Sequence, residues 1–275
     1  MIARRPCVAA VLSALVFASC APIVNRDTSI RVLVYNIHAG KDTGGRDNLA
    51  DVAALIRTTD ADVILLQEVD RGTRRSGNID QLRTLMDATG YAGVFGRSLD
   101  YDGGTYGIAA LSKDGFTFDF TSPLQVTPEQ TRAGGSHEPR VVLTAVTTTS
   151  RGRLQTFNTH LDASATDEYR LQEVVQLLLP VRVRMAPETP VVVGGDFNAE
   201  PGSGPIKRML DEGLRDAWVE CGQGDGFTFP STAPVKRIDY LFLSGQLTCS
   251  SAQVIDSLAS DHRPLLVTVE GVGWP

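Results

Sequence analysis

The strongest constraint on the fold of this chain comes from polar motifs that lie at the ends of short apolar runs. Each motif carries amide, carboxylate or imidazole side chains, and together they span most of the sequence: YNIH (35–38), LQEVD (66–70), NTHL (158–161), GDFN (195–198) and SDHRP (260–264). Strand ends in a layered α/β fold meet at one edge, where ligands bind. Gathered side chains of these types suit a hard cation and a phosphate-like substrate.

The apolar patterns alternate between strands and helices. Four stretches have helical spacing: residues 48–58, 79–89, 166–179 and 206–212. We expect Pro180 to end the third of these helices. Ten short apolar or β-rich runs are expected to be strands: 30–35, 63–66, 91–95, 106–111, 141–147, 154–158, 191–193, 238–243, 252–255 and 265–269. Strands outnumber helices and several neighbours look antiparallel, which favours two packed sheets with helices outside. We expect one domain over residues 29–271.

The first residues are typical of an export signal. Arg4 and Arg5 precede an apolar stretch at 8–17, which is shorter than the roughly 20 residues of a membrane span. The sequence LVFASC (15–20) resembles a bacterial lipobox, so we expect a signal peptide at 1–19, a lipid anchor at Cys20 and a tether at 20–28. The alternative is that the signal peptide is cleaved near Ala21 without lipid attachment and the protein is secreted freely. A third interpretation is that the hydrophobic N-terminus is not cleaved. The expected location is outside the cytoplasm, at the membrane.

The net charge and the cysteine content limit the classes of function that are compatible with this chain. The formal net charge is −6 and becomes −8 once Arg4 and Arg5 are removed. No long Lys/Arg stripe is present, which argues against a tight, sequence-independent grip on a polyphosphate backbone. Cys221 and Cys249 remain in a compartment that permits disulfides, where they either pair or stay as small buried thiols.

Three polar residues follow apolar runs that we expect to be buried strands. Glu68 comes after residues 63–66, and a buried carboxylate needs a partner or a metal, although a salt bridge to Arg71 or Arg74 would also serve. Asp196 and Asn198 follow two glycines, which permit close approach to a ligand, although an Asx-turn would explain the same residues.

Three of the four histidines lie in the strand-end motifs. His262 can exchange a proton near neutral pH if a neighbour fixes its tautomer, and Asp239 is the natural partner. His160 ends the expected strand at 154–158. A lone histidine in either place would also be compatible with a satisfied surface residue.

Eight motifs in this order resemble the endonuclease/exonuclease/phosphatase superfamily. They are YNIH (35–38), LQEVD (66–70), YGIAALS (106–112), EPRVVL (138–143), NTHL (158–161), GDFN (195–198), RIDY (237–240) and SDHRPL (260–265). The stretch from Gln67 to Gln81 is most similar to a bacterial, exported branch. The resemblance implies a deoxyribonuclease-I-like α/β fold, a four-layer sandwich of two mixed sheets flanked by helices.

The resemblance also implies roles for individual residues. Glu68, with Asn36 and Asp261, would bind Mg²⁺ or Mn²⁺, and Asn36 would also contact the substrate phosphate. Asp196 would orient or deprotonate the attacking water, and Asn198 would hold the phosphoryl oxygens.

The remaining implied roles belong to the histidines and one arginine. His262, steered by Asp239, would act on the phosphate or as an acid–base group. His160 would bind the phosphate or protonate the leaving oxygen, and Arg140 would add positive charge near the phosphate. His38 departs from the family pattern, in which an Asp or another polar residue is common.

These roles predict a metal-dependent hydrolase of phosphodiesters that uses activated water. Nucleic acid and phospholipid or sphingomyelin headgroups are the favoured substrate classes, whereas phosphomonoesters or inositol phosphates would need more Lys and Arg around the pocket than the sequence indicates. The protein is expected to be a monomer. The competing hypothesis is a catalytically inactive surface protein that uses the same fold to bind a partner, since fold does not fix function. Such a protein would be expected to lose some of Glu68, Asp196, Asn198, Asp261 or His262, and all five are present.

Overall fold

The computed structural model describes residues 29–125, 137–149, 152–185 and 189–271, which form two packed six-stranded sheets. The predicted signal peptide at 1–19 and tether at 20–28 lie outside the described residues. The first sheet has the spatial order β11 (Leu247–Val254), β12 (Leu265–Gly271), β1 (Ser29–Asn36), β2 (Val63–Arg71), β4 (Gly104–Ser112), β3 (Ala92–Tyr101). The second has the order β5 (Phe118–Leu124), β6 (Arg140–Thr149), β7 (Gly152–His160), β8 (Val191–Asp196), β10 (Asp239–Leu243), β9 (Arg215–Asp216).

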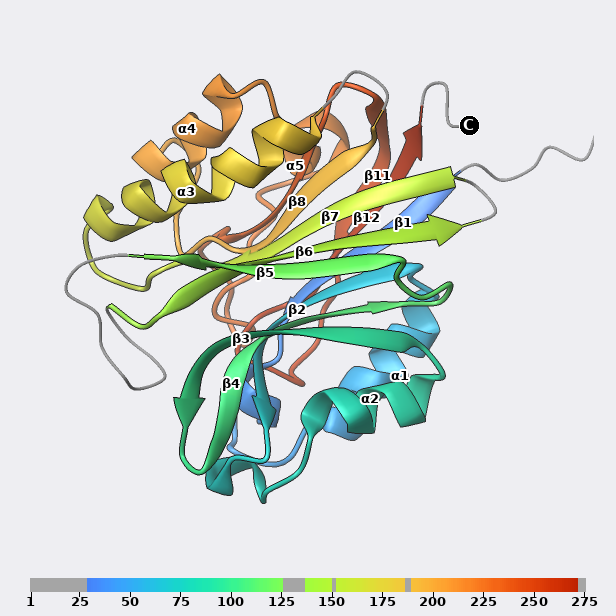
Figure 1. The fold of residues 1–275 in the computed structure, drawn as a ribbon, viewed down its shortest axis with the longest axis vertical. Coiled ribbons are helices and arrows are strands. Elements are labelled where there is room, and N and C mark those ends of the chain that lie inside the picture. The colour runs from blue at the N-terminus through green and yellow to red at the C-terminus, as the bar shows by residue number, and fades with distance from the viewer. Residues whose placement is uncertain (1–28, 126–136, 150–151, 186–188, 272–275) are drawn as a thin grey trace, which may run out of the picture.

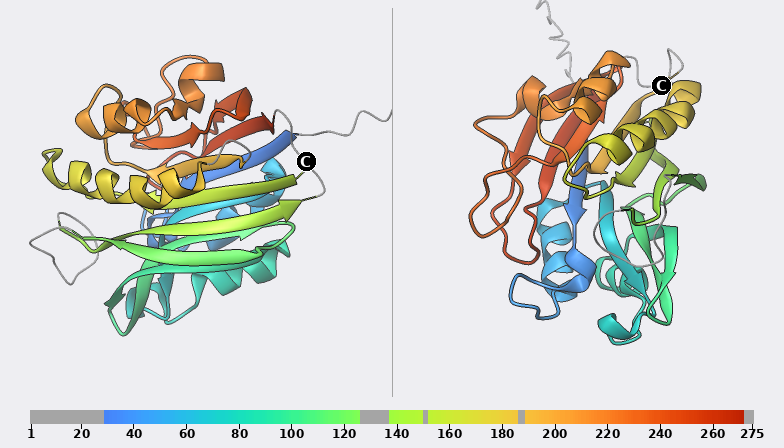
Figure 2. Two further views of the ribbon diagram at one scale, coloured as in Figure 1. Left: turned by 45° about the horizontal axis from the view of Figure 1, so that its top comes forward. Right: turned by 90° about the vertical axis from the view of Figure 1, so that its left-hand side faces the viewer.

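Helices cover the outer face of each sheet (Figures 1 and 2). Helices α1 (Leu49–Thr59) and α2 (Gln81–Thr89) pack on the first sheet, and α3 (Glu168–Arg184) and α4 (Gly204–Asp211) pack on the second. The short helix α5 (Ala217–Cys221) contacts β10 and β11, one strand from each sheet, and its Ala217 belongs to the core between them. Short 3₁₀ turns occupy His38–Gly40 and Arg74–Ser76. The predicted four-layer sandwich of two mixed sheets flanked by helices is confirmed.

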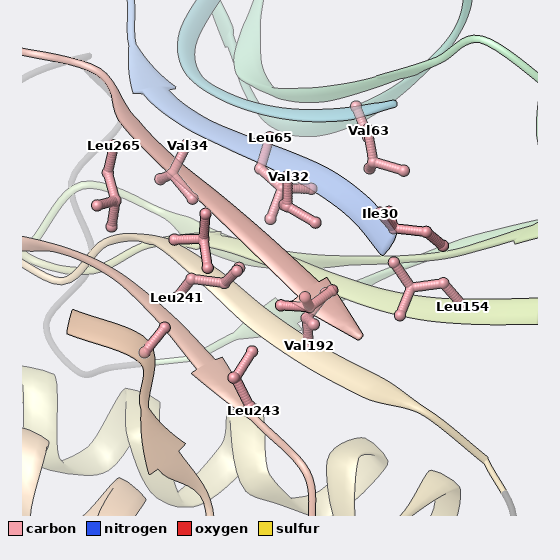
Figure 3. Close-up of a cluster of buried hydrophobic side chains, with 14 of the residues drawn as sticks. Ile30, Val32, Val34, Val63, Leu65, Leu154, Val192, Leu241, Leu243 and Leu265 are labelled. Atoms are coloured by element: carbon pink, nitrogen blue, oxygen red, sulfur yellow. The ribbon is translucent and has the colours of Figure 1, made fainter. Parts of the chain in front are cut away.

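Aliphatic side chains fill the space between the sheets (Figure 3). Val34 and Leu65 come from the first sheet, and Val192 and Leu241 come from the second; all four are fully buried. Because β1, β2 and β8 are also covered on their outer faces, they read as nearly continuous apolar runs. Complete burial of one such side chain contributes about 1.5–3 kcal/mol.

Helix α3 continues through Pro180, so the prediction that this proline ends the helix was wrong. Proline removes one helical hydrogen bond and costs about 3 kcal/mol in a helix interior. The turn around it buries Leu177, Leu178 and Val181 completely against the second sheet. Three buried aliphatic side chains at about 1.5–3 kcal/mol each outweigh that cost.

Strands β5 and β9 and helix α5 were not predicted from the sequence. The two strands are the edges of the second sheet, and Phe118 and Phe120 of β5 are exposed. Helix α5 has only five residues and starts at Asp216, whose side chain accepts the Trp218 N–H. A short edge strand and a one-turn helix both lack the long apolar periodicity that identifies an element.

The structure resolves the open question about the cysteines, because Cys221 and Cys249 form a disulfide. The bridge joins α5 to β11 and closes a loop of 28 residues. In the described part of the chain, every helix is too short or too polar to cross a membrane.

Candidate active site

The candidate site lies at the edge where the carboxyl ends of the central strands meet. In the first sheet β1 and β2 are parallel, and Asn36 lies beside Gln67. In the second sheet β7 and β8 are parallel, and His160 lies beside Asp196. The antiparallel strand β10 begins with Asp239, which is paired with Asp196. The topology therefore brings five of the eight predicted motifs to one edge.

Glu68 reaches this edge because β2 contains a bulge. The pairing of β2 with β4 shifts between Leu66 and Val69, and Glu68 has a φ of 57°. A bulge of this kind re-aims the side chain of the extra residue, and the left-handed backbone of a non-glycine residue is strained. The Asn36 amide nitrogen donates to the carboxylates of both Glu68 and Asp196, each at 3.1 Å. Asn36 therefore links acidic groups from the two sheets.

Next to this link, the buried side-chain amides of Gln67 and Asn158 form a second connection between the two sheets. Gln67 Nε2 donates to Asn158 Oδ1 at 2.7 Å, and Asn158 Nδ2 donates to the backbone oxygens of Leu66 and Ala109. Both amides are fully buried and come from different sheets. Both residues lie in motifs that the sequence singles out, but no pattern indicated that they join the sheets.

His262 and Asp239 form a close, buried pair. His262 Nδ1 lies 2.9 Å from Asp239 Oδ2, and its Nε2 lies 3.5 Å from Asp196 Oδ2. Burial alone would lower the pKa of His262, but the carboxylates of Asp239 and Asp196 raise it well above its ordinary value. Burial raises the pKa of Asp196, and His262 opposes that rise. This arrangement favours a protonated imidazole held in one orientation.

Phe229 packs against the His262 ring, with 4.9 Å between the ring centroids. The contact with this aromatic ring restricts the position of the imidazole. Sequence analysis did not identify Phe229, because it lies in an irregular segment between α5 and β10 with no motif around it.

His160 has the opposite electrostatic setting. Its Nε2 lies 3.5 Å from Asp196 Oδ2, and its pKa is well below the ordinary value because of burial, with Arg140 and His262 as further causes. Arg140 is itself buried and paired with Glu138 at 2.6 Å. His160 is therefore favoured as a neutral hydrogen-bond donor or acceptor, and the buried guanidinium acts on it through charge.

Asn198 follows β8 in a left-handed conformation, with φ of 47°. Its backbone N–H donates to Asp196 Oδ1 at 2.9 Å, and its amide nitrogen donates to the Leu161 oxygen at 2.9 Å. The Asx-turn that the sequence allowed is therefore present, and it fixes the carboxylate of Asp196. Asn198 and His262 also line a cavity of about 420 Å³.

Asp261 lies beside the end of β1. Its Oδ1 is 3.8 Å from His38 Nδ1, and the neighbouring Ser260 hydroxyl donates to the Asn36 backbone oxygen at 2.7 Å. His38 therefore faces Asp261, where it pairs with the carboxylate only when protonated. All the predicted metal and catalytic residues are thus connected to the same edge of the sandwich.

The electrostatics of the site fit a bound cation. Asp196, Asp239 and, in its neutral form, His262 each offer a ligand atom, and these atoms lie within 4.8 Å of one another. In the described part of the chain, the buried Asp239 Oδ1 has no hydrogen-bond partner. Within the same described ranges, no Lys or Arg forms an ion pair with Glu68, Asp196 or Asp239. Excess buried negative charge is costly unless a cation compensates it.

The architecture and this cluster of buried acids and imidazoles define the deoxyribonuclease-I-like class of layered phosphoesterase folds. Within that class, the chain belongs to the Endonuclease/Exonuclease/phosphatase family, whose model matches residues 33–262. A comparison with curated proteins gave no match.

Solved structures of low sequence identity share the fold. An endonuclease/exonuclease/phosphatase from Beutenbergia cavernae has a TM-score of 0.75 and 22% identity, with 90% of this chain and 72% of that chain covered. A mannosyl-6-phosphatase from Bacteroides thetaiotaomicron has a TM-score of 0.71 and 18% identity, covering 87% and 99%. The catalytic domain of human Nocturnin with bound sulfate has a TM-score of 0.68 and 21% identity, covering 89% and 95%.

Glu173 on α3 is a buried acid behind the site and gives a pH-dependent prediction. Burial raises its pKa to about 8, against opposing effects of the Asp162 N–H and Arg140. The unfolded chain ionises this carboxyl near its ordinary value of 4.5, so stability should fall as pH rises from about 4.5 to about 8. Glu173→Gln removes the ionisation and can keep the acceptor for Asp162.

The difference in melting temperature between Glu173→Gln and wild type should therefore grow in favour of the variant between pH 5 and pH 8. Glu168→Gln, exposed on the same helix, serves as the control and should show no such trend. Thermal melts at several pH values measure both differences. A pH-independent difference for Glu173→Gln would contradict the assigned burial effect.

Proposed function

We propose that this protein hydrolyses phosphodiester bonds with an activated water and a divalent cation, Mg²⁺ or Mn²⁺. The observation that carries the proposal is the convergence on Asp196: Asn36, His160 and His262 all lie within 3.5 Å of its carboxylate. A carboxylate held among an amide and two imidazoles is suited to orient a water and accept its proton.

Glu68, Asn36 and Asp261 are the residues that would hold the cation, beside the cluster of Asp196, Asp239 and His262. When bound, the cation would neutralise charge that builds up on the phosphoryl oxygens. Glu68 supplies a half-buried carboxylate with no basic partner within the described ranges. Oxygen ligands of this kind are those that Mg²⁺ and Mn²⁺ prefer.

The two histidines would have different roles in the reaction, because their pKa values are shifted in opposite directions. His262, which is favoured as imidazolium, would stabilise charge on the phosphoryl group or donate a proton to the leaving oxygen. His160, which is favoured as neutral imidazole, would hydrogen-bond a phosphoryl oxygen. Asn198 would help to position the same group, and Arg140 would act at longer range by keeping His160 neutral.

Export and membrane attachment are part of the proposal. The signal pattern at 1–19 and Cys20 support a lipid-anchored, monomeric enzyme outside the cytoplasm, with free secretion as the alternative. Intact-mass analysis of the protein purified from its host tests this. A mature chain that still carries residues 1–19 would contradict signal cleavage.

A substrate panel tests the activity. The mature protein is assayed with bis(p-nitrophenyl) phosphate, plasmid DNA, RNA, sphingomyelin and phosphatidylinositol, with Mg²⁺, Mn²⁺ or EDTA. The similar structure named a mannosyl-6-phosphatase adds sugar phosphates to the panel. We expect hydrolysis that EDTA abolishes. If no ester is cleaved with either metal, the inactive binding protein becomes the better interpretation.

A further inference from the structure

The cavity of about 420 Å³ beside His262 indicates which substrate class the site accepts, an inference that rests on the proposed function. Four loop segments and the start of α3 surround it: the loop after β7, the loop after β8, the irregular segment before β10 and the loop between β11 and β12. Its lining includes His262 and Asn198 from the site, so an alcohol esterified to the reacting phosphate would extend into it. The cavity therefore bears on which alcohol the enzyme accepts.

Only some of the charged side chains that line the cavity are free to contact a ligand. Arg170 is buried, and its guanidinium is occupied by Asp167 and by the backbone oxygens of Asp162 and Ser164. Lys236 and Glu200 are exposed, and the described residues provide no side-chain partner for either. One ammonium and one carboxylate are thus available to a ligand at the same cavity.

Two hydroxyl groups at the cavity also have no hydrogen-bond partner among the described residues. Ser164 Oγ and Ser203 Oγ are buried and form no hydrogen bond with the described part of the chain. A hydroxyl is both a donor and an acceptor, and an unsatisfied buried one costs free energy. With Lys236 and Glu200, these groups form a small set of donors and acceptors of mixed charge.

This set disfavours two substrate types. A choline group needs a cage of aromatic faces, but the cavity has one aromatic residue, Phe229, whose ring packs on His262. The ammonium of Lys236 would also repel a quaternary ammonium. A nucleobase needs an open aromatic platform and a basic track for neighbouring phosphates, and the cavity offers neither.

We infer that the cavity binds a polyhydroxylated alcohol, a sugar or polyol, esterified to the phosphate that the site cleaves. Lys236, Glu200 and Ser203 are the residues that would select it, because hydroxyl groups can donate to the carboxylate and accept from the ammonium. Hydrolysis forms one bond from the water oxygen to phosphorus and breaks the bond from phosphorus to the alcohol oxygen. The water loses one proton to Asp196, and the alcohol oxygen gains one from the His262 imidazolium.

The test compares esters that differ only in the alcohol. Mature wild type, Lys236→Ala and Ser203→Ala are assayed with Mg²⁺ on the methyl phosphodiesters of glycerol, inositol and choline and on bis(p-nitrophenyl) phosphate. Lys207→Ala, an exposed lysine on α4 outside the cavity, is the matched control. Vesicles of phosphatidylglycerol distinguish a lipid source of the headgroup from a free ester.

We expect wild type to prefer the polyol esters over the choline ester by at least tenfold in kcat/KM. Lys236→Ala should lose about tenfold more kcat/KM on the polyol esters than on bis(p-nitrophenyl) phosphate, consistent with one charged hydrogen bond. Lys207→Ala should change neither. Equal losses on all substrates, or an equal rate on the choline ester, would overturn the inference alone. Absence of metal-dependent hydrolysis in wild type would overturn the proposed function and this inference together.

Discussion

Glu68→Gln is expected to reduce metal-dependent hydrolysis of bis(p-nitrophenyl) phosphate by about a hundredfold or more. Glutamine keeps an oxygen that accepts from the Asn36 amide but removes the negative charge. The loss of charge should weaken the cation site, whose effect on the phosphoryl oxygens is typically worth about this factor. The measurement is kcat/KM across a Mg²⁺ titration.

A second measurement separates a metal role from a structural one. Mg²⁺ should raise the melting temperature of wild type, since binding to the native state stabilises it, and should raise that of Glu68→Gln less. Without metal the two proteins should melt at similar temperatures, because Glu68 is only half-buried. Glu168→Gln is the control for the assay. Full turnover by Glu68→Gln would remove Glu68 from the mechanism.

The fold could be predicted where local pattern and packing agree. The apolar runs of β1, β2 and β8 are buried on both faces, so composition alone identifies them. The order of eight motifs then indicated the sandwich, which no single run could. Edge strand β5 and the passage of α3 through Pro180 depend on neighbours far along the chain, and no local pattern encodes them.

The composition of the site could also be predicted in part from the sequence. Residue type and strand-end position indicated that Asn36, Asp196 and His262 would meet, and the structure brings them together. The bulge that turns Glu68 inward depends on pairing between β2 and β4. The contact of Phe229 with His262 depends on tertiary packing, and it has no sequence signal. The sequence therefore predicted which residues form the site but not how their side chains are oriented.

His262→Ala is the second variant with a large expected effect. The imidazole lies between Asp239 and Asp196, and its removal should cut kcat/KM by about a hundredfold or more, as for typical acid–base groups. The cavity left beside Phe229 will also cost some stability, so melting temperatures accompany the kinetics. A variant with full turnover would show that the imidazole has no part in the reaction.

Asp239→Asn provides the more informative partner variant, because it changes the charge next to His262 and keeps the shape. Asp239 is a main cause of the raised pKa of His262, so the pKa should fall in Asp239→Asn. If the reaction needs the imidazolium, activity should be lost at a lower pH than in wild type, and the alkaline limb of the kcat/KM profile should move down. The double variant of His262→Ala and Asp239→Asn should be little worse than His262→Ala alone, since the carboxylate acts through the imidazole. An unshifted alkaline limb, or fully additive losses, would mean that Asp239 acts on the substrate or cation independently of His262.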